Sequence, residues 1–525
     1  MDEAVIDASE AVLERLETDD DVAYAAVGGV DRRVADAVVA DGRVRSANDL
    51  RETGVWWRLF ADGAADYRYV TTLDDDHVEE VIARSLRSAR MLDQSTPASY
   101  DWGTVHRATH PGWGESNGRG TTDGGDTDDR EAVDDGRAVG DGEAADDGEG
   151  RAVPADARAE RVRTALADAF DGVDVDLDRS RATLRDERVE TLVSTTTGSA
   201  VRTTLDRASV ETTVVPAGGP TLHRHDGATT GERFLDSLAD RFADLASRTR
   251  EAAAADEVAL DASPLAGGGR ADVVLGPLAA GELLHHLSHY FETDLAYFGS
   301  SPVDVGDRLG PESLSVADAV PPGSWAARAY DAEPRPTQPV SLVDDGVVRS
   351  RLHDVSTAIE EETHPAGHLL PALGFDGPPR IHARHLDVAA GGASETALRA
   401  DADLYVERLG TPRFGNEATR TKRASTMPPS PLYAKDIAES TPAEFADEAD
   451  DQSLHLPVDE GYLLDGGDRA ARVTGVDLTF APADLRAATL GGTRRTLTGT
   501  CEKHKTRLPF AVTAPAVRLP LVVRG

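Results

Sequence analysis

The pattern of apolar residues along this chain stops between Gly112 and Asp156, and this interruption constrains the fold more than any other sequence feature. Residues 115–150 contain 13 acidic side chains against three arginines, set among Gly, Thr and Ala. Such a segment buries too little apolar area to offset the entropy lost when a chain is ordered. We therefore expect a disordered insertion at 113–156. A solvated linker is favoured over a functional acidic tail.

The chain before the insertion alternates between helical and strand-like spacing. Apolar residues at Val5, Ala8, Val12 and Leu16 predict a helix from Glu3 to Leu16. Short alternating strands should follow between residues 22 and 70, with a turn at 61–63, and then a second helix from His77 to Met91. Residues 1–112 are therefore expected to form a small N-terminal α+β module.

The chain after the insertion is too long for one further core. A middle α+β module is expected at 157–255. Its predicted elements are a helix at 157–170, strands at 173–177, 181–187, 190–195, 200–205 and 209–215, and a long helix at 232–254. A strand at 271–275 and a helix at 279–290 then open a C-terminal domain, 256–525, which is rich in strands and punctuated by Gly and Pro. The predicted fold class is α+β.

The charge balance excludes some partners. The chain carries 94 acidic against 55 basic residues, a formal net charge of -39, which disfavours binding to nucleic acid and to anionic membrane surfaces. The only lysines are Lys422, Lys435, Lys503 and Lys505. Dense carboxylates with almost no lysine are expected of a halophilic protein that stays hydrated in molar salt, although high-GC codon bias would also favour arginine over lysine.

Other features indicate a soluble, cytoplasmic protein. No apolar run approaches the roughly 18 residues that a membrane span needs. The N-terminus is acidic and opens an amphipathic helix, unlike a signal peptide. The single cysteine, Cys501, rules out an intramolecular disulfide and suits a reducing compartment.

The segment 281–294 carries the clearest chemical signal. His285 and His289 are four residues apart, so a helix would present both imidazoles to one metal ion. Cys501 is a candidate third ligand, and its basic neighbours should lower the pKa of its thiol. The alternative is that both histidines are ordinary surface or core residues and that Cys501 is a small buried hydrophobe.

Four segments resemble the TldD/PmbA family of metallopeptidases. Residues 283–294 are similar to the family pattern Leu-Leu-His-Glu-x-x-x-His-x-x-Glu-x-Asp, and residues 499–503 to its closing Gly-x-Cys-Gly-Lys block. Residues 331–348 resemble its Asp-Asp-Glu-Gly segment and hairpin, and residues 379–383 stand where it has Pro-Arg-Met-x-Asn. The resemblance implies a TldD/PmbA-like fold and a zinc site that uses the closing Cys.

The sequence departs from this pattern at functional positions. Leu284 stands where the family has its first zinc-binding His, and His285 where it has the general-base Glu. The closing block keeps Cys501 and Lys503, but Glu502, Lys505 and Thr506 replace Gly, Gly and Gln. The resemblance therefore transfers two zinc ligands, His289 and Cys501, and no catalytic Glu.

Two interpretations follow. In the first, His285 replaces the lost ligand beside His289 and Cys501, Glu292 or Glu282 supplies the base, and the chain hydrolyses unstructured peptides with zinc. In the second, the chain is a non-catalytic, PmbA-like partner or scaffold of an active TldD-type peptidase. Both imply a homo-oligomer, or a hetero-oligomer with another family chain. His364, His368, His382 and His385 lie in segments that face the cavity in the family, but they are expected to be ordinary loop or strand residues.

Overall fold

One antiparallel sheet joins the two predicted α+β modules. The computed structural model describes residues 1–61, 64–91, 153–229, 232–294, 301–414 and 453–524. In this sheet, called sheet A, the strand order is β3-β2-β1-β4-β5-β6, so the N-terminal and middle modules supply three neighbouring strands each. The strands are β1 (Val22–Ala40), β2 (Arg43–Ala61), β3 (Ala64–Val70), β4 (Leu177–Thr195), β5 (Ala200–Pro216) and β6 (Leu222–Ala228). The predicted insertion, 113–156, lies outside the described residues except for its last four.

The strands of sheet A are longer than the sequence pattern predicts. The strands expected at 181–187 and 190–195 form one strand, β4, as do those at 200–205 and 209–215, which form β5. Charged residues at or beside the expected gaps, Glu187 and Arg207, pair with each other across the sheet. Glu187 of β4 accepts hydrogen bonds from Arg32 of β1, at 2.8 Å, and from Arg207 of β5. Because each charge has a partner on the next strand, the ladder continues through them.

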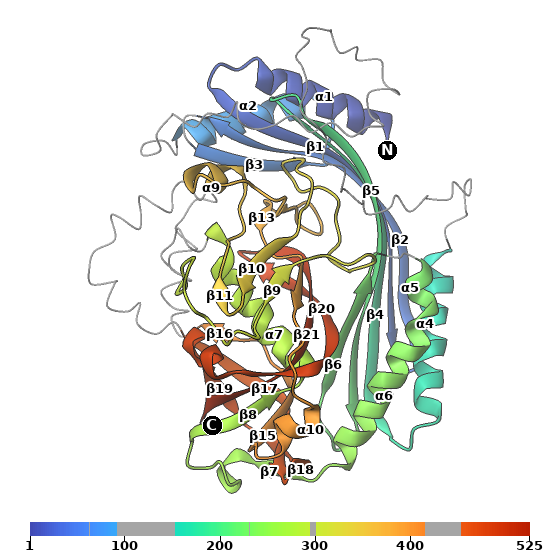
Figure 1. Ribbon diagram of the computed structural model, residues 1–525. Coiled ribbons are helices and arrows are strands. Elements are labelled where there is room, and N and C mark those ends of the chain that lie inside the picture. The colour runs from blue at the N-terminus through green and yellow to red at the C-terminus, as the bar shows by residue number, and fades with distance from the viewer. Residues whose placement is uncertain (62–63, 92–152, 230–231, 295–300, 415–452, 525) are drawn as a thin grey trace, which may run out of the picture.

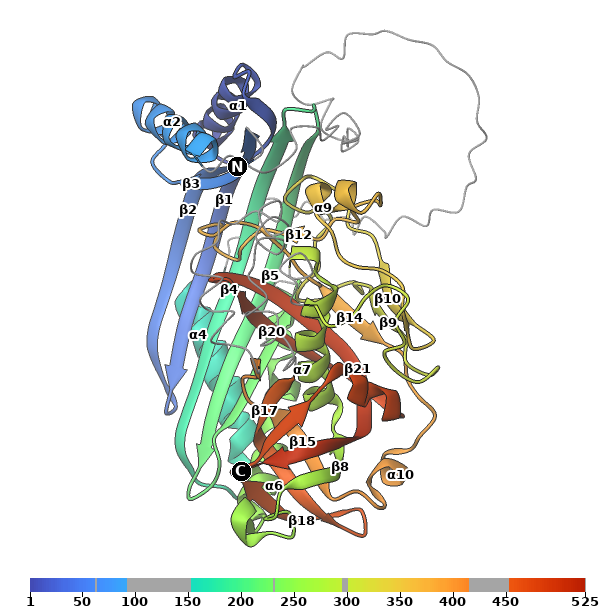
Figure 2. The same ribbon diagram turned by 90° about the vertical axis from the view of Figure 1, so that its left-hand side faces the viewer.

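The two faces of sheet A contact different parts of the protein. On β2, Val55, Trp57 and Leu59 pack under the first two helices, whereas Trp56 and Phe60 join the core of the C-terminal domain. This is the period-two alternation of a strand buried on both faces. The helices on the outer face are α1 (Glu3–Glu17), α2 (Asp75–Met91), α4 (Ala155–Asp171), α5 (Glu232–Asp236) and α6 (Leu238–Ala254). Figures 1 and 2 show these helices on one face and the C-terminal domain against the other.

Most predicted helices are confirmed. The helices expected at 3–16, 77–91 and 157–170 match α1, α2 and α4 within two residues at each end. The long helix expected at 232–254 is divided at Ser237, whose hydroxyl bonds the carbonyl oxygen of Phe234 at 2.7 Å. None of the helices in the described ranges is long and apolar enough to cross a membrane.

A second, mixed sheet of 13 strands, sheet B, forms the core of the C-terminal domain. Its path is β11-β10-β9-β14-β21-β8-β15-β17-β18-β7, and β16, β19 and β20 pair with β17 or β21. The strands are β7 (Glu257–Ala259), β8 (Gly269–Leu275), β9 (Val316–Asp318), β10 (Val340–Asp344), β11 (Val347–Val348), β14 (His385–Val388), β15 (Leu404–Leu409), β16 (Arg413–Phe414), β17 (Leu454–Asp465), β18 (Asp468–Thr474), β19 (Asp477–Phe480), β20 (Thr489–Lys503) and β21 (Thr506–Arg524). Together the two sheets and their helices confirm the α+β class.

Short elements complete the C-terminal domain. A separate pair of two-residue strands consists of β12 and β13, and β13 leads directly to His382. The remaining elements are β12 (Leu369–Leu370), β13 (Arg380–Ile381), helices α7 (Pro277–Ser288), α9 (Val355–Glu360) and α10 (Glu395–Arg399), and 3-10 turns η2 (Leu260–Ala262), η3 (His289–Phe291) and η6 (Pro482–Ala487).

A buried arginine connects sheet A to the C-terminal domain. Arg58 of β2 projects from the same face as Trp56 and Phe60, and its guanidinium lies over the Phe60 ring, 4.6 Å from the centroid. It donates hydrogen bonds to Glu333 and, at 2.8 Å, to Asp354, which is the N-cap of α9. All three side chains are buried. The two carboxylates therefore share one cation that comes from the other sheet.

We predict that Arg58→Met destabilises the folded chain by about 3 to 5 kcal/mol, because it leaves two buried carboxylates without their cation. Urea unfolding should show this loss at pH 7. The matched control is Arg33→Met, which removes an exposed arginine from the neighbouring strand β1 and should change stability by less than about 0.5 kcal/mol. Equal losses in the two variants would contradict the role given to Arg58.

Candidate metal centre

Helix α7 carries two of the predicted ligands and is fixed against sheet B. It begins with Pro277, directly after β8, where proline's fixed φ favours the first helical position. Leu283 and Leu287 are buried. The helix lies so close to β20 that a Cβ atom on Gly281 would be 3.3 Å from the Cβ of Leu497. This packing sets the direction in which the following histidines point.

His285 and His289 meet on one face of the helix end, as predicted. His285 is in the last turn of α7, and His289 caps the helix and begins η3. Their ring centroids are 5.0 Å apart, and both side chains are buried. The ring of His285 also stacks on Phe510 of β21, with centroids 3.6 Å apart and planes 8° from parallel. The stacking holds this ring, while its Nε2 has no hydrogen-bond partner among the described residues.

Cys501 reaches the two histidines from strand β20. Strands β20 and β21 form a hairpin whose turn, His504 and Lys505, has φ values of 49° and 65°, the left-handed conformation typical of a tight two-residue turn. The Sγ of Cys501 lies 3.5 Å from Nε2 of His289. Burial alone would raise the pKa of this thiol, but His289 and His382 lower it to about 6. The lowered pKa agrees with the prediction, although these imidazoles, and not the residues next to Cys501 in sequence, cause it.

His382 is a fourth member of this group. It follows strand β13, is completely buried, and its ring centroid is 5.5 Å from those of both His285 and His289. Neither of its ring nitrogens has a hydrogen-bond partner in the part of the chain that the structure describes. From the sequence we expected an ordinary strand or loop residue. The sequence feature that could have identified it is its place in the segment 379–383, which stands where the family has Pro-Arg-Met-x-Asn.

These four side chains can hold one metal ion. One ligand atom from each of His285, His289, His382 and Cys501 lies within 4.8 Å of all the others. Unpaired buried imidazole nitrogens are costly, and a metal ion would satisfy them. Imidazole and thiolate are the donors that zinc prefers. We call these four residues the His3Cys cluster. The donor set fits zinc, and no carboxylate belongs to the cluster.

Glu292 holds His289 in place. Its Oε2 is 2.9 Å from Nδ1 of His289 and 2.6 Å from Nζ of Lys503, and its Oε1 accepts from the backbone N–H of Ala383. His289 and Lys503 keep the pKa of this buried carboxyl far below its usual value, against the effect of burial. Because both oxygens are engaged on the side of the ring away from Cys501, Glu292 is placed to orient a ligand, as carboxylates behind metal-binding histidines do. The role of Glu292 as general base stays a prediction.

Glu282 and the remaining histidines have partners outside the cluster. Glu282 pairs with Arg408 at 2.5 Å and accepts from the N–H of Leu409 at 2.7 Å, so its carboxylate is bound at β15. Burial raises its pKa. His368 bonds Asp318 at 2.6 Å and His385 bonds Ser324 at 2.8 Å. His364 is exposed. None of them belongs to the cluster formed by described residues.

No structural role was assigned to Lys503 from the sequence. Its ammonium is buried and donates to Glu292 at 2.6 Å, to Asp294 at 2.7 Å and to the carbonyl oxygen of Ile381 at 2.8 Å. Sequence similarity marked Lys503 and Glu292 only as members of two separate family patterns. The structure shows that they are one ion pair, which lies next to His289.

A metallopeptidase family model and a curated metalloprotease match parts of this chain. The model of the PmbA/TldA metallopeptidase C-terminal domain matches residues 268–422, which include three of the four cluster residues. A metalloprotease from Methanothermobacter thermautotrophicus is 28% identical over 238 residues, which are 42% of this chain and 49% of that protein. The chain thus spans about half the length of the curated relative it matches. These similarities support a metallopeptidase-type role.

Solved structures share the fold over almost the whole chain. TldE from Thermococcus kodakarensis has a TM-score of 0.64 at 14% identity, with 99% of this chain and 100% of that chain covered. A proposed modulator of a DNA gyrase from Thermotoga maritima has a TM-score of 0.62 at 15% identity, with the same coverage. The matched domain and the curated relative indicate the TldD/PmbA family, and the solved structures show that the chain shares the fold of TldE and of the gyrase modulator.

Proposed function

We propose that this chain is a zinc-dependent metallopeptidase-type protein that hydrolyses unstructured peptides. The observation that carries the proposal is the His3Cys cluster, in which three imidazoles and a thiol with a lowered pKa meet in a buried place. A bound zinc ion would polarise a scissile carbonyl and lower the pKa of water. His285, His289 and Cys501 are the proposed ligands, as expected from the sequence.

The neighbours of the ligands support this assignment. Glu292 and Lys503 fix the ring of His289 so that its Nε2 faces Cys501. Phe510 fixes the ring of His285 by stacking. A ligand set that is held before the ion binds loses little conformational entropy on binding, which favours affinity.

His382 is the proposed proton acceptor. Catalytic zinc sites use three protein ligands, so the cluster contains one more donor than such a site needs. His382 directly follows the short strand β13, whereas the other three lie at the end of α7, in η3 and on β20. Both nitrogens of His382 lack partners among the described residues. An imidazole with a free nitrogen is the commonest general base. His382 would then do the work of the Glu that this chain has replaced by His285.

Burial of the cluster favours an extended substrate. His285, His289, His382 and Cys501 are each no more than 9% exposed. A loop of a folded protein would not reach such a site, whereas a single extended chain needs only a narrow path. This is the reason to retain unstructured peptides as the proposed substrate class.

A second candidate function is a non-catalytic partner of an active family member. The observation in its favour is that the cluster contains no carboxylate, because Glu282 and Glu292 are both held by other groups. In this case the chain would act in a hetero-oligomer with another TldD/PmbA chain.

We predict about one zinc ion per chain in protein purified without chelator. Cys501→Ala and His289→Ala should each lose most of it, because each removes a donor from a buried site. Metal analysis of the purified variants measures this. The matched control is His364→Ala, which removes an exposed imidazole and should keep the wild-type content. Metal-free wild-type protein, with unchanged stability in both ligand variants, would contradict the proposal.

For His382→Ala we predict retained zinc and a loss of about 10²- to 10⁴-fold in kcat/KM for peptide cleavage, the usual contribution of a general base. Metal analysis and peptide kinetics on one preparation separate the two effects. Loss of zinc together with activity would instead identify His382 as a ligand.

The partner hypothesis predicts a different result for His285→Ala. If the chain is non-catalytic, it should co-purify with another family chain, and cleavage by that pair should be insensitive to this substitution. If the chain is the peptidase, purified wild-type chain alone should cleave an unstructured peptide, and His285→Ala should abolish cleavage. Size-exclusion chromatography of the active fraction identifies which assembly is present.

A further inference from the structure

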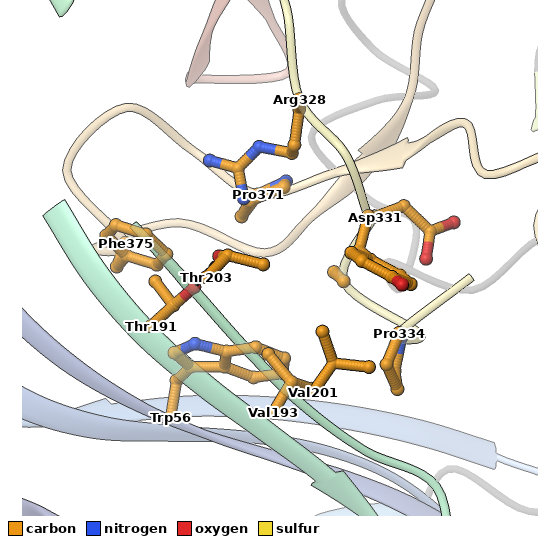
Figure 3. A pocket seen from close by; sticks show the side chains of 12 residues that line it. Trp56, Thr191, Val193, Val201, Thr203, Arg328, Asp331, Pro334, Pro371 and Phe375 are labelled. Carbon is orange, nitrogen blue, oxygen red and sulfur yellow. Dashed lines mark hydrogen bonds between the residues drawn. The ribbon is translucent and has the colours of Figure 1, made fainter. Parts of the chain in front are cut away.

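A small cavity lies between sheet A and the C-terminal domain, apart from the His3Cys cluster. Its volume is about 10 Å³, enough for about one water-sized particle. Trp56 of β2 forms one wall and Arg328 of the C-terminal domain the opposite one, with Thr191 and Thr203 of sheet A between them (Figure 3). None of its lining residues belongs to the proposed metal centre.

Trp56 directs an unpaired donor at this cavity. The side chain is 2% exposed, and its indole Nε1 has no hydrogen-bond partner among the residues described. Buried tryptophans usually bond this N–H, and leaving it unpaired costs about 1 to 3 kcal/mol. The ring cannot easily turn away, because it lies on Gly28, where a Cβ atom would be 2.1 Å from its Cε2.

Arg328 supplies a positive charge without a counter-ion. Within the described ranges no carboxylate lies at ion-pair distance from its guanidinium, which is only partly exposed. Burial, together with the nearby Arg207, lowers the pKa of Arg328 to about 9, although the charges of Glu187 and Asp331 act in the opposite direction. The carboxylate of Glu187 is already bound by Arg32 and Arg207. Among the described residues, the guanidinium of Arg328 therefore has no carboxylate in direct contact.

Asp331, the acidic residue at the rim, is not the counter-ion of Arg328. Asp331 lines the cavity, but its Oδ1 accepts from the backbone N–H groups of Glu333 and Arg335, each at 2.9 Å, and its Oδ2 from that of Leu369 at 3.2 Å. Figure 3 shows its carboxylate turned away from Trp56. Thr191 and Thr203 bond each other at 2.7 Å. Because only one of the two donates in that bond, the other hydroxyl keeps its proton available.

We propose that this cavity is a binding site for one monatomic anion, chloride in salt solution, held by Arg328 and the indole N–H of Trp56. The groups at the cavity offer hydrogen-bond donors and a positive charge. An anion therefore fits them better than a cation or a ligand with few hydrogen-bond acceptors. The cavity, at about 10 Å³, is too small for phosphate and for both oxygens of a carboxylate group. Since Trp56 and Arg328 come from different sheets, the anion would join sheet A to the C-terminal domain.

Crystals of the full chain grown in sodium bromide test the site directly. Anomalous diffraction from the wild-type protein should show one bromide between Arg328 and Trp56. Crystals of Arg328→Gln should lose this peak, while those of Arg43→Gln, which removes an exposed arginine of β2, should keep it. Wild-type crystals with no anomalous peak in the cavity would overturn the proposal. So would displacement of bromide by an equal concentration of acetate, because the site would then accept a carboxylate.

Thermal unfolding gives a second readout that needs no crystals. A site with a Kd of about 50 mM would increase the folded-to-unfolded ratio roughly 20-fold at 1 M chloride. Tm of the wild-type chain and of Arg43→Gln should therefore rise when chloride replaces gluconate at constant ionic strength. Arg328→Gln should lose this rise, and Trp56→Phe, which removes only the N–H and part of the ring, should reduce it. Equal chloride effects in all four proteins would overturn the proposal.

Discussion

The proposed metal centre depends on one buried ammonium group. Lys503 is two residues beyond Cys501, and its Nζ bonds Glu292 and Asp294, which follow His289, as well as the carbonyl of Ile381, which precedes His382. One cation therefore fixes the relative positions of three segments that are far apart in the sequence, and each of them carries a member of the His3Cys cluster. A buried ammonium is stable only when it is fully paired, and here two carboxylates and a carbonyl pair it. The same contacts that compensate the charge thus assemble the site.

The Lys503 network also determines which atoms remain free for a ligand. Glu292 bonds Nδ1 of His289, so that the opposite nitrogen, Nε2, is the one that faces Cys501. The polar groups behind the cluster are therefore engaged, while nitrogens of His285 and His382 inside it are unpaired among the described residues. Around the cluster the polar groups are hydrogen-bonded, and inside it imidazole nitrogens are not. This contrast favours a ligand site over a chance group of histidines.

Sequence reasoning predicted what depends on local spacing. Helical periodicity located α1, α2 and α4, and the four-residue interval placed His285 and His289 on one face. The same reasoning divided β4 and β5 into shorter strands, because it could not show that Glu187 pairs with Arg207 and with the distant Arg32. The same reasoning left His382 out of the candidate site, because its inclusion requires knowing that the end of β13 lies beside the end of α7. Spacing along the chain contains no such information, and a family resemblance supplied only the segments in which to look.

The interface between the two sheets shows how an acidic chain uses its arginines. Arg58 and Arg32 are buried there, and each has carboxylate partners. Arg328 has none among the described residues, although acidic side chains greatly outnumber basic ones in this protein. A shortage of carboxylates cannot be the reason. Asp331 is only three residues away, but backbone N–H groups bind both of its oxygens. The local chain conformation therefore keeps Asp331 from pairing with Arg328, although the two residues are close in sequence.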